Sequence, residues 1–152
     1  MAVKSFQGPR ADSIEEKTKI LVKHHMAKKL ISFKPEQSAL DAMEILLKNK
    51  ISGGPVIDDH GDLVGIISEG DCLKQISHSR YYNAPMMNIK VKDYMVKNVK
   101  TIDAFATIFE AADQFLNSHI RRFPVMEHGK LVGQISQRDV LEAVLKMKGQ
   151  TW

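Results

Sequence analysis

Hydrophobic and polar residues follow the same order in the two halves of the chain. In each half, apolar residues recur at the spacing of one helix face, and two short apolar runs then flank a glycine turn, at Gly61 and Gly129. The helix positions lie 69 residues apart: Ala39, Leu40, Met43, Leu46 and Leu47 against Ile108, Phe109, Ala112, Phe115 and Leu116. We therefore predict a helix followed by a β-hairpin in each half.

Further elements complete each half. An extended segment precedes each helix, at residues 29–33 and 99–102, and Ser38–Asp41 and Thr107–Glu110 have the spacing of a capping box. The hairpin strands are expected at 54–57 and 63–67, and at 123–126 and 131–135, and a last helix begins near Ser68 or Ser136. The sequence thus predicts an α/β (α+β) fold of two β-α-β-β-α repeats.

The two halves also share identical residues. Residues 22–57 match 91–126 with 9 identities in 36 positions, and residues 60–73 match 128–141 with 9 in 14. The densest stretches, LVGIISEGDCL and LVGQISQRDVL, keep polar as well as core residues, which suggests a site present twice.

These matches divide the chain into segments. We assign copy one to residues 22–76 and copy two to 91–145, with an N-terminal tail and short helix at 1–21, a linker at 77–90 and a C-terminal tail at 146–152. The short helix is expected from Ser13 to Lys23, and the linker is expected to expose Tyr81 and Tyr82. The matching Met26 and Met95 are interpreted as packing residues.

Composition narrows the class of protein. Hydrophobic residues at 43% and charged residues at 26% are ordinary for a globular protein, and no apolar run is long enough to span a bilayer. The N-terminus has no apolar signal region, and the one cysteine, Cys72, excludes an internal disulfide, so we expect a cytoplasmic protein. The net charge of +4 is compatible with an anionic ligand or nucleic acid, although the lysines are spread along the chain.

A Gly-x-x-Ser-x-x-Asp motif occurs at 65–71 and again at 133–139, each time between an apolar strand and a helix start. A helix N-terminus presents unpaired N–H groups, which suit a phosphate, and the serine hydroxyl adds a donor. The aspartate one turn later can accept hydrogen bonds from two ribose hydroxyls. Ser-x-x-Asp is equally the spacing of a capping box. The spacing alone favours helix capping over ribose-phosphate binding, and both interpretations stay open at this point.

The whole repeat resembles a tandem pair of CBS domains, often called a Bateman module. The resemblance is carried by the ISGGPVID and IRRFPVME strands, the LVG strands and the two Ser-x-x-Asp helix starts, and it covers about residues 22–145. It implies two copies related by a pseudo-twofold axis, with two clefts between them for an adenine nucleotide (AMP, ADP or ATP) or S-adenosylmethionine as a regulatory ligand. The implied ligand residues are Thr101, Ile120, Arg121, Pro124, Ser136 and Asp139 in one cleft, and Ser32, Ile51, Ser52, Gly53, Ser68 and Asp71 in the other.

The two copies differ in charge near these motifs. Copy two has Arg121, Arg122 and Arg138 where copy one has Ser52, Gly53 and Gly70. Arginine forms charge-assisted, often bidentate bonds to phosphate, so the copy-two cleft is expected to be the tighter one and to favour a phosphate-rich ligand. The alternative is that these side chains point to solvent or pair with a carboxylate.

No catalytic or metal-binding arrangement is expected. The histidines lack metal-ligand spacing, His60 and His128 are interpreted as turn residues, and Cys72 replaces Val140 at a core helix position. We therefore expect a regulatory or energy-sensing module without enzyme activity or catalytic cofactor. The resemblance also implies a homodimer formed through the helices, and we expect any protein effector to act in trans. The alternatives are an interaction adaptor without ligand and, less favoured, a nucleic-acid binder.

Overall fold

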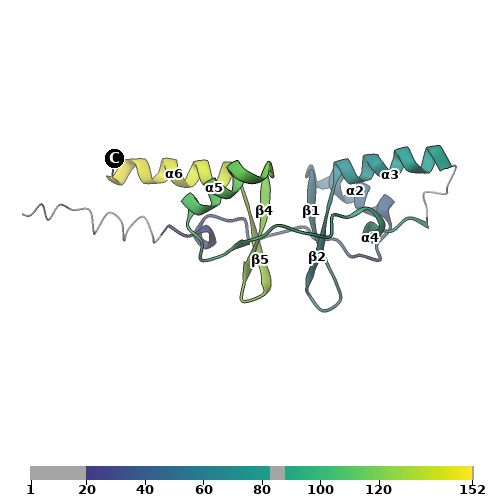
Figure 1. Ribbon diagram of the computed structural model, residues 1–152, viewed down its shortest axis with the longest axis horizontal. Coiled ribbons are helices and arrows are strands. Elements are labelled where there is room, and N and C mark those ends of the chain that lie inside the picture. The colour runs from purple at the N-terminus through teal and green to yellow at the C-terminus, as the bar shows by residue number, and fades with distance from the viewer. Residues whose placement is uncertain (1–19, 83–87, 152) are drawn as a thin grey trace, which may run out of the picture. The chain divides into compact units, whose positions relative to one another are not determined.

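The computed structural model describes residues 20–82 and 88–151, which form two compact units (Figure 1). The copy-one unit comprises residues 29–82, 88–101 and 128–131. The copy-two unit comprises residues 20–28, 102–127 and 132–151. Each unit therefore contains most of one copy together with a segment from the other.

The copy-one unit is built on a hairpin flanked by helices. Strands β1 (Gly53–Ile57) and β2 (Leu63–Ser68) pair antiparallel, with Gly53 opposite Ser68. Helix α2 (Ala39–Asn49) precedes the hairpin and α3 (Glu69–Tyr82) follows it, and both helices pack together in Figure 1. The short α4 (Val91–Tyr94) packs on α3 and β2.

The copy-two unit repeats this arrangement. It begins with the 3-10 turn η1 (Val22–His24), and β3 (Ile102–Asp103) pairs in parallel with β4 (Arg122–Glu127). Strand β4 forms a hairpin with β5 (Lys130–Ser136), and α5 (Ile108–Ser118) packs on α6 (Gln137–Thr151). The bridge between Phe33 and Val56 in the copy-one unit has the same register as the pairing of Ile102 with Val125, 69 residues later.

The leading segments of the two copies are exchanged. The start of copy two lies in the copy-one unit, where the amide of Val91 bonds to the Gln37 carbonyl at 2.9 Å and Val96 exchanges two backbone bonds with Ile66 at 2.9 and 2.8 Å. The start of copy one lies in the copy-two unit and forms the matching bonds, which are Val22 to Ala106 at 2.8 Å and the pair between Ala27 and Gln134 at 2.9 and 3.0 Å. Each hairpin is thus completed by a strand-like segment of the other copy.

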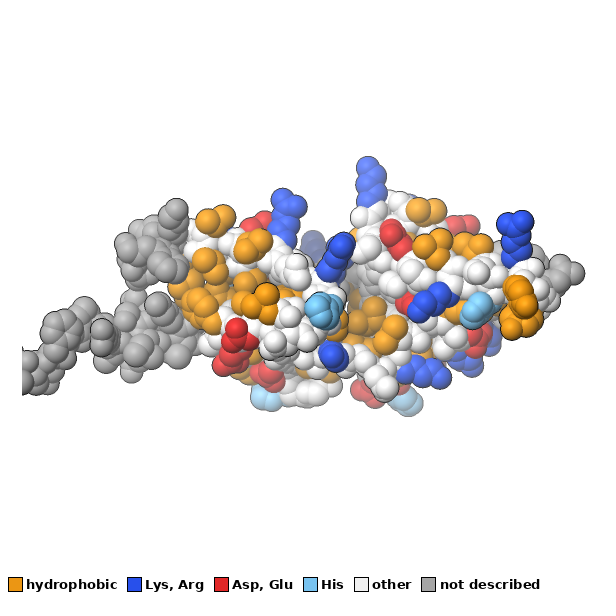
Figure 2. Space-filling view, turned by 45° about the horizontal axis from the view of Figure 1, so that its top comes forward, with side chains coloured by type: hydrophobic (Ala, Val, Ile, Leu, Met, Phe, Trp, Pro, Cys, Tyr) orange, Lys and Arg blue, Asp and Glu red, His pale blue; other side chains and the backbone are white. Residues whose placement is uncertain are grey.

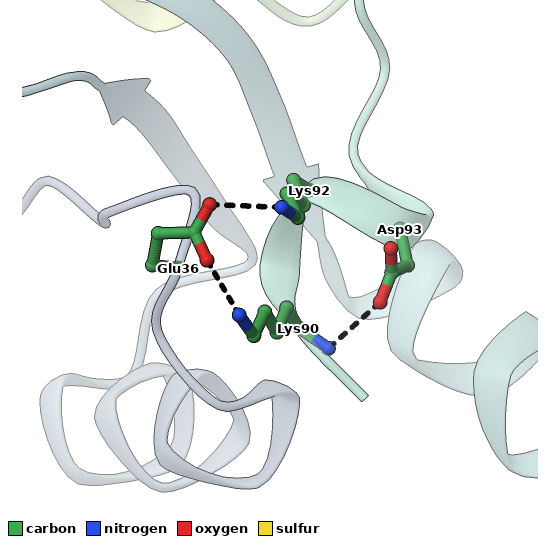
Figure 3. A network of polar contacts seen from close by, with 4 residues as sticks. All are labelled: Glu36, Lys90, Lys92 and Asp93. Carbon is green, nitrogen blue, oxygen red and sulfur yellow. Dashed lines mark hydrogen bonds and ion pairs between the residues drawn. The ribbon is translucent and has the colours of Figure 1, made fainter. Parts of the chain in front are cut away.

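Ion pairs join both exchanged segments to the units in which they lie. Glu36 accepts hydrogen bonds from the ammonium groups of Lys90 at 2.6 Å and Lys92 at 2.9 Å, and the Lys90 amide bonds to Asp93 at 3.0 Å (Figure 3). In the copy-two unit, the matching Lys23 pairs with Glu127 at 3.0 Å and lies 5.2 Å from the ring centre of Phe105, which occupies the position of Glu36. The matching lysines, Lys92 and Lys23, therefore bind equivalent segments through different carboxylates, Glu36 and Glu127.

Two hydrophobic clusters form the cores. Each includes a fully buried valine from the exchanged segment, Val91 in one and Val22 in the other, so the exchange contributes to the core of both units. The other fully or nearly buried members are Phe33, Ala42, Leu46, Val56, Ile67 and Cys72 in the copy-one unit, and Ile102, Ala104, Ala111, Phe115, Phe123, Val125, Ile135 and Val140 in the copy-two unit.

Most predicted elements are confirmed, with four differences. The extended segment at 29–33 forms only a single bridge, at Phe33. Helix α3 continues to Tyr82, into the segment assigned to the linker, and α6 continues to Thr151, into the segment assigned to the C-terminal tail. Tyr81 and Tyr82 are exposed as expected. Residues 13–19 of the expected N-terminal helix lie outside the described residues, and 22–24 form a 3-10 turn. None of the helices in the described ranges is long and apolar enough to cross a membrane.

The starts of α2 and α5 follow local sequence signals more closely than their ends do. The Thr107 hydroxyl accepts the amide of Glu110 at 3.1 Å, as the predicted cap requires, whereas Ser38 accepts the amide of Leu40 instead of Asp41. Both α2 and α5 end on a residue in the left-handed conformation, Lys50 and His119, each with φ of 54°. This conformation favours glycine, so these two helix ends carry a conformational cost.

Candidate functional site

Each unit holds one half-site, built from the loop before the first hairpin strand and the start of the last helix. Half-site one consists of residues 51–53 and 68–71, and half-site two of 120–122 and 136–139. A backbone bond joins the two parts, from the Glu69 amide to the Ser52 carbonyl at 2.9 Å, and from the Gln137 amide to the Arg121 carbonyl at 3.2 Å. The loop is therefore fixed against the helix start in the same way in both copies.

The Ser-x-x-Asp motif forms a reciprocal helix cap in both half-sites. The amide of Ser68 donates to Asp71 Oδ2 at 2.9 Å and the amide of Asp71 donates to Ser68 Oγ at 3.3 Å. In half-site two the same bonds join Ser136 and Asp139 at 2.9 and 3.1 Å. The capping interpretation of the motif is thus confirmed, and such caps typically contribute about 0.5–2 kcal/mol.

The cap leaves specific polar groups open. Within the described ranges, Oδ1 of Asp71 and of Asp139 accepts no hydrogen bond, because the cap uses only Oδ2. Most first-turn amides are also occupied, since the loop carbonyl and the serine oxygen accept two of them. The remaining first-turn amide, of Gly70 in α3 and of Arg138 in α6, has no hydrogen-bond acceptor among the described residues. The half-site can therefore offer one carboxylate oxygen, one amide and, in copy two, a serine hydroxyl.

Half-site two is the more accessible of the two. Asp71 is only 6% exposed and its Oδ2 also accepts the Ser68 hydroxyl at 2.9 Å. Asp139 is partly exposed, and the Ser136 hydroxyl donates to no acceptor within the described part of the chain. A ligand hydroxyl would thus meet a freer carboxylate and a freer serine in copy two.

Charge distinguishes the half-sites further. Arg121, Arg122 and Arg138 are exposed, and the one ion pair found for them in the described structure joins Arg138 to Glu142 at 3.5 Å. At the first position of the helix, copy one has Glu69 where copy two has Gln137. Sequence reasoning missed Glu69, although the aligned LVGIISEGDCL and LVGQISQRDVL stretches contain the signal. One turn later the charges are reversed, because copy one has Lys74 where copy two has Glu142, and this reduces the difference in charge between the two half-sites.

The remaining predicted site residues divide into exposed and buried positions. Ser32 is exposed and directly precedes Phe33, whose amide bonds to the Pro55 carbonyl at 2.9 Å beside β1. Thr101 is exposed and directly precedes β3, but its contacts group it with the copy-one unit and not with half-site two. Pro124 is buried within β4. Ile51 and Ile120 are partly buried at the start of the two loops.

Gly53 is constrained by the hairpin itself. A Cβ at Gly53 would lie 2.8 Å from the Ile67 carbonyl oxygen, so β2 approaches too closely for any larger residue without a shift. Arg122 occupies the matching position of copy two. The difference between the two loops is therefore one of backbone packing as well as charge.

Cys72 and the two matched turn histidines, His60 and His128, lie outside the half-sites. Burial raises the pKa of the Cys72 thiol, and the nearby Asp71 carboxylate raises it further, which is the opposite of an activated thiolate. His60 lies in the turn of the first hairpin, and His128 lies in the second with φ of 51°. Across the residues that the structure describes, no cluster of histidine, cysteine and carboxylate side chains could hold a metal ion.

Both copies of the repeat match a known protein family. The CBS domain family profile matches residues 22–78 and 91–146. Protein MJ1426 of Methanocaldococcus jannaschii is 30% identical over 155 residues, covering 83% of this chain and 92% of that protein. The chloroplastic CBS domain-containing protein CBSX2 of Arabidopsis thaliana is 30% identical over 142 residues, covering 78% of this chain and 60% of that protein.

Two solved structures are similar in fold and contain ligands. The crystal structure of CBSX2 in complex with AMP has a TM-score of 0.74 and 31% identity, covering 84% of this chain and 98% of that one. The CBS domain pair of protein MJ0100, in complex with 5-methylthioadenosine and S-adenosyl-L-methionine, has a TM-score of 0.69 and 26% identity, covering 82% and 98%. Both ligands of the second structure and the AMP of the first share an adenosine moiety.

Proposed function

Because this chain belongs to the CBS domain family, we propose that it is a regulatory module that binds an adenosyl ligand at its Ser-x-x-Asp half-sites. The observation that carries the proposal is the cap geometry, which occupies Oδ2 of each aspartate and leaves Oδ1 free. A carboxylate oxygen held rigidly at a helix start is suited to accept hydrogen bonds from ribose hydroxyls. The AMP complex of CBSX2 and the adenosyl complexes of MJ0100 support this class of ligand.

A thermal shift panel tests the proposal. AMP, ADP, ATP and S-adenosylmethionine are added to the purified chain, and a ligand at about 100 times its Kd should stabilise the folded state by roughly 2.7 kcal/mol. For a chain of this size, that corresponds to a rise in Tm of about 5–10 °C. No shift with any of the four would contradict ligand binding and would favour a protein-interaction adaptor.

A single-atom change locates the ligand. Asp139→Asn keeps a carbonyl oxygen that can cap α6 but replaces the second carboxylate oxygen with an NH₂ donor. Losing a hydrogen bond to a charged group costs about 1.5–3 kcal/mol, so affinity should fall at least about tenfold by calorimetry. Thr107→Ala, which removes the cap of α5 in the same unit, is the control and should bind as the wild type does. Unchanged affinity in Asp139→Asn would place the ligand elsewhere.

We further propose that half-site two prefers a ligand with more than one phosphate. Half-site two contains three exposed arginines, in its loop and in the first turn of α6, whereas half-site one has an acidic residue, Glu69, and two glycines at the compared positions. Arginine pairs strongly with phosphate oxygens, and each further phosphate adds a site for such a pair. The preference for ATP over AMP should therefore depend on Arg121, Arg122 and Arg138.

Neutralising these residues one at a time measures the preference. Arg121→Gln, Arg122→Gln and Arg138→Gln are titrated with AMP and ATP, and at least one should lose affinity for ATP about tenfold more than for AMP. Lys48→Gln removes an exposed positive charge on α2 and is the control. Equal losses for both nucleotides in all three variants would show that the arginines do not contact the additional phosphates.

The module is also proposed to be a non-catalytic homodimer. Leucines on the helices are strongly exposed, including Leu47 at 76% and Leu116 at 78%, and hydrophobic side chains are visible on the surface of both units in Figure 2. Exposed apolar surface of this kind favours association. Leu116→Glu should reduce the mass measured by light scattering from dimer to monomer, and a wild-type monomer would refute the proposal. The cytoplasmic location stays a prediction.

A further inference from the structure

The second half of α3 buries polar groups that have no partner. Gln75 is completely buried, and neither Nε2 nor Oε1 forms a hydrogen bond. Ser79, one turn later on the same face, is 6% exposed and its Oγ is also unpaired. Buried unpaired polar groups destabilise the state that buries them. The matching positions of α6 are apolar, Ala143 and Met147.

The exposed residues of the same segment include three large side chains with apolar surface, beside Ser77, His78 and Arg80. Ile76 is 41% exposed, Tyr81 82% and Tyr82 72%. A helix that packs through an apolar face has the opposite arrangement. In α6, by contrast, Val140 and Ala143 are buried and Val144 is partly buried. Hydrophobic burial therefore holds the second half of α3 weakly compared with the same part of α6.

Local helix propensity adds to this weakness. Residues 75–82 read QISHSRYY, which contains two serines, a histidine, an isoleucine and two tyrosines, all poorer helix formers than alanine or leucine. The matching start of the α6 segment reads AVLKM, with stronger helix formers. Among the described residues, His78 joins the segment to α4: its Nδ1 lies 3.4 Å from the Tyr94 hydroxyl, and the two ring centres are 5.8 Å apart.

We propose that residues 75–82 form a detachable arm, which opens from the copy-one unit while the first turn of α3 stays capped. Opening lets water bond to Gln75 and Ser79, which removes the cost of burying them. Asp71 lies in the turn that stays in place and belongs to half-site one. A ligand on Asp71 would strengthen that turn and favour the closed arm; this coupling rests on the proposed function, whereas the opening does not.

Hydrogen exchange of the full chain without ligand tests the opening. Amides of residues 75–82 should exchange at least about tenfold faster than those of 143–147, because local opening sets their rate. The double variant Gln75→Leu/Ser79→Ala removes the unpaired groups with little change in volume, and it should slow this exchange about tenfold and raise Tm by about 3 °C or more.

A matched pair on another helix provides the control. Gln114 is exposed on α5 and Ser118 follows it by four residues, as Ser79 follows Gln75. Gln114→Leu/Ser118→Ala should leave exchange in 75–82 unchanged. The proposal is overturned if wild-type residues 75–82 exchange as slowly as 143–147. It is also overturned if the Gln75→Leu/Ser79→Ala variant exchanges faster and melts lower, since the polar groups would then be satisfied when closed.

The ligand arm of the experiment separates the two proposals. Saturating AMP should slow exchange in residues 75–82 of the wild type but not of Asp71→Asn. If AMP raises Tm and exchange in 75–82 does not change, the coupling is refuted and the ligand proposal stands. If no adenosyl ligand binds, the coupling fails together with the proposed function, and exchange without ligand alone decides whether the arm opens.

Discussion

Gly133→Ala tests how the exchanged segment is held in the copy-two unit. A Cβ at position 133 would lie 2.7 Å from the Ala27 carbonyl oxygen and 2.6 Å from Met26 Sδ. The methionine side chain can move, but the carbonyl belongs to the backbone bridge between Ala27 and Gln134. Relieving the contact to an ordinary 3.4 Å requires a shift of about 0.7 Å in one of the two segments.

The size of the effect follows from the bonds that this shift disturbs. The bridge consists of two backbone hydrogen bonds of 2.9 and 3.0 Å, and the same shift would lengthen both beyond bonding range. Two such bonds contribute about 1–3 kcal/mol, and overpacking a tight interior typically costs a further 1–3 kcal/mol. The free energy of unfolding should therefore fall by about 2–6 kcal/mol.

Urea unfolding monitored by circular dichroism measures the free energy of unfolding, and a thermal melt should show a Tm lower by about 4–24 °C. Gly65→Ala should behave in the same way, because its Cβ would lie 2.9 Å from the Val96 carbonyl oxygen in the copy-one unit. Gly70→Ala is the control, since its nearest neighbour would be 3.6 Å away. A Gly133→Ala protein within about 0.5 kcal/mol of the wild type would refute the packing of residues 26–27 against β5.

Three further predictions concern the helix ends, the ion pairs and the exchanged segments. Lys50→Gly and His119→Gly should each raise the free energy of unfolding by about 1 kcal/mol, because glycine adopts their left-handed conformation without strain, and thermal melts check this. Lys90 and Lys92 lower the pKa of Glu36 from 4.5 to about 2, so this ion pair stabilises the folded state fully above pH 4.5 and ceases to do so as pH falls towards 2. The difference in Tm between the wild type and Glu36→Gln should shrink across that range. A difference in Tm that stays constant would contradict the pairing. A fragment of residues 22–78 lacks the buried Val91 and should show no cooperative melt, whereas 29–101 should melt cooperatively.

The order of elements could be predicted because its signals are local. Apolar periodicity identified both hairpins and both pairs of helices, and the Thr107 cap was read from spacing alone. The length of α3 could not be predicted in this way. Beyond Cys72 its buried positions are Gln75 and Ser79, so the pattern that indicates a helix face disappears where the helix continues.

The exchange of leading segments was not predictable, since a repeat does not show which copy its first residues pack against. Sequence alone interprets Met26 and Met95 as packing residues, and the structure places each against a glycine of the other copy, Gly133 and Gly65. The sequence contains both partners of each contact, as two matched methionines and two matched glycines. Pairing them within a copy or between copies requires the backbone path, which depends on bonds between residues distant in sequence.

The two interpretations of Ser-x-x-Asp turn out to be compatible, because capping engages one carboxylate oxygen and ribose binding would need the other. Duplication preserved the part that the fold requires, namely the cap and the amide-to-carbonyl bond that fixes the loop. The other side chains of the loop and first turn take no part in the cap or in this backbone bond. Ser52 in copy one and Arg121 in copy two, and likewise Gly70 and Arg138, could therefore differ without loss of the helix start. Under the proposed function, the two half-sites would therefore differ in ligand preference through the charge of these side chains, while the backbone that carries them is the same.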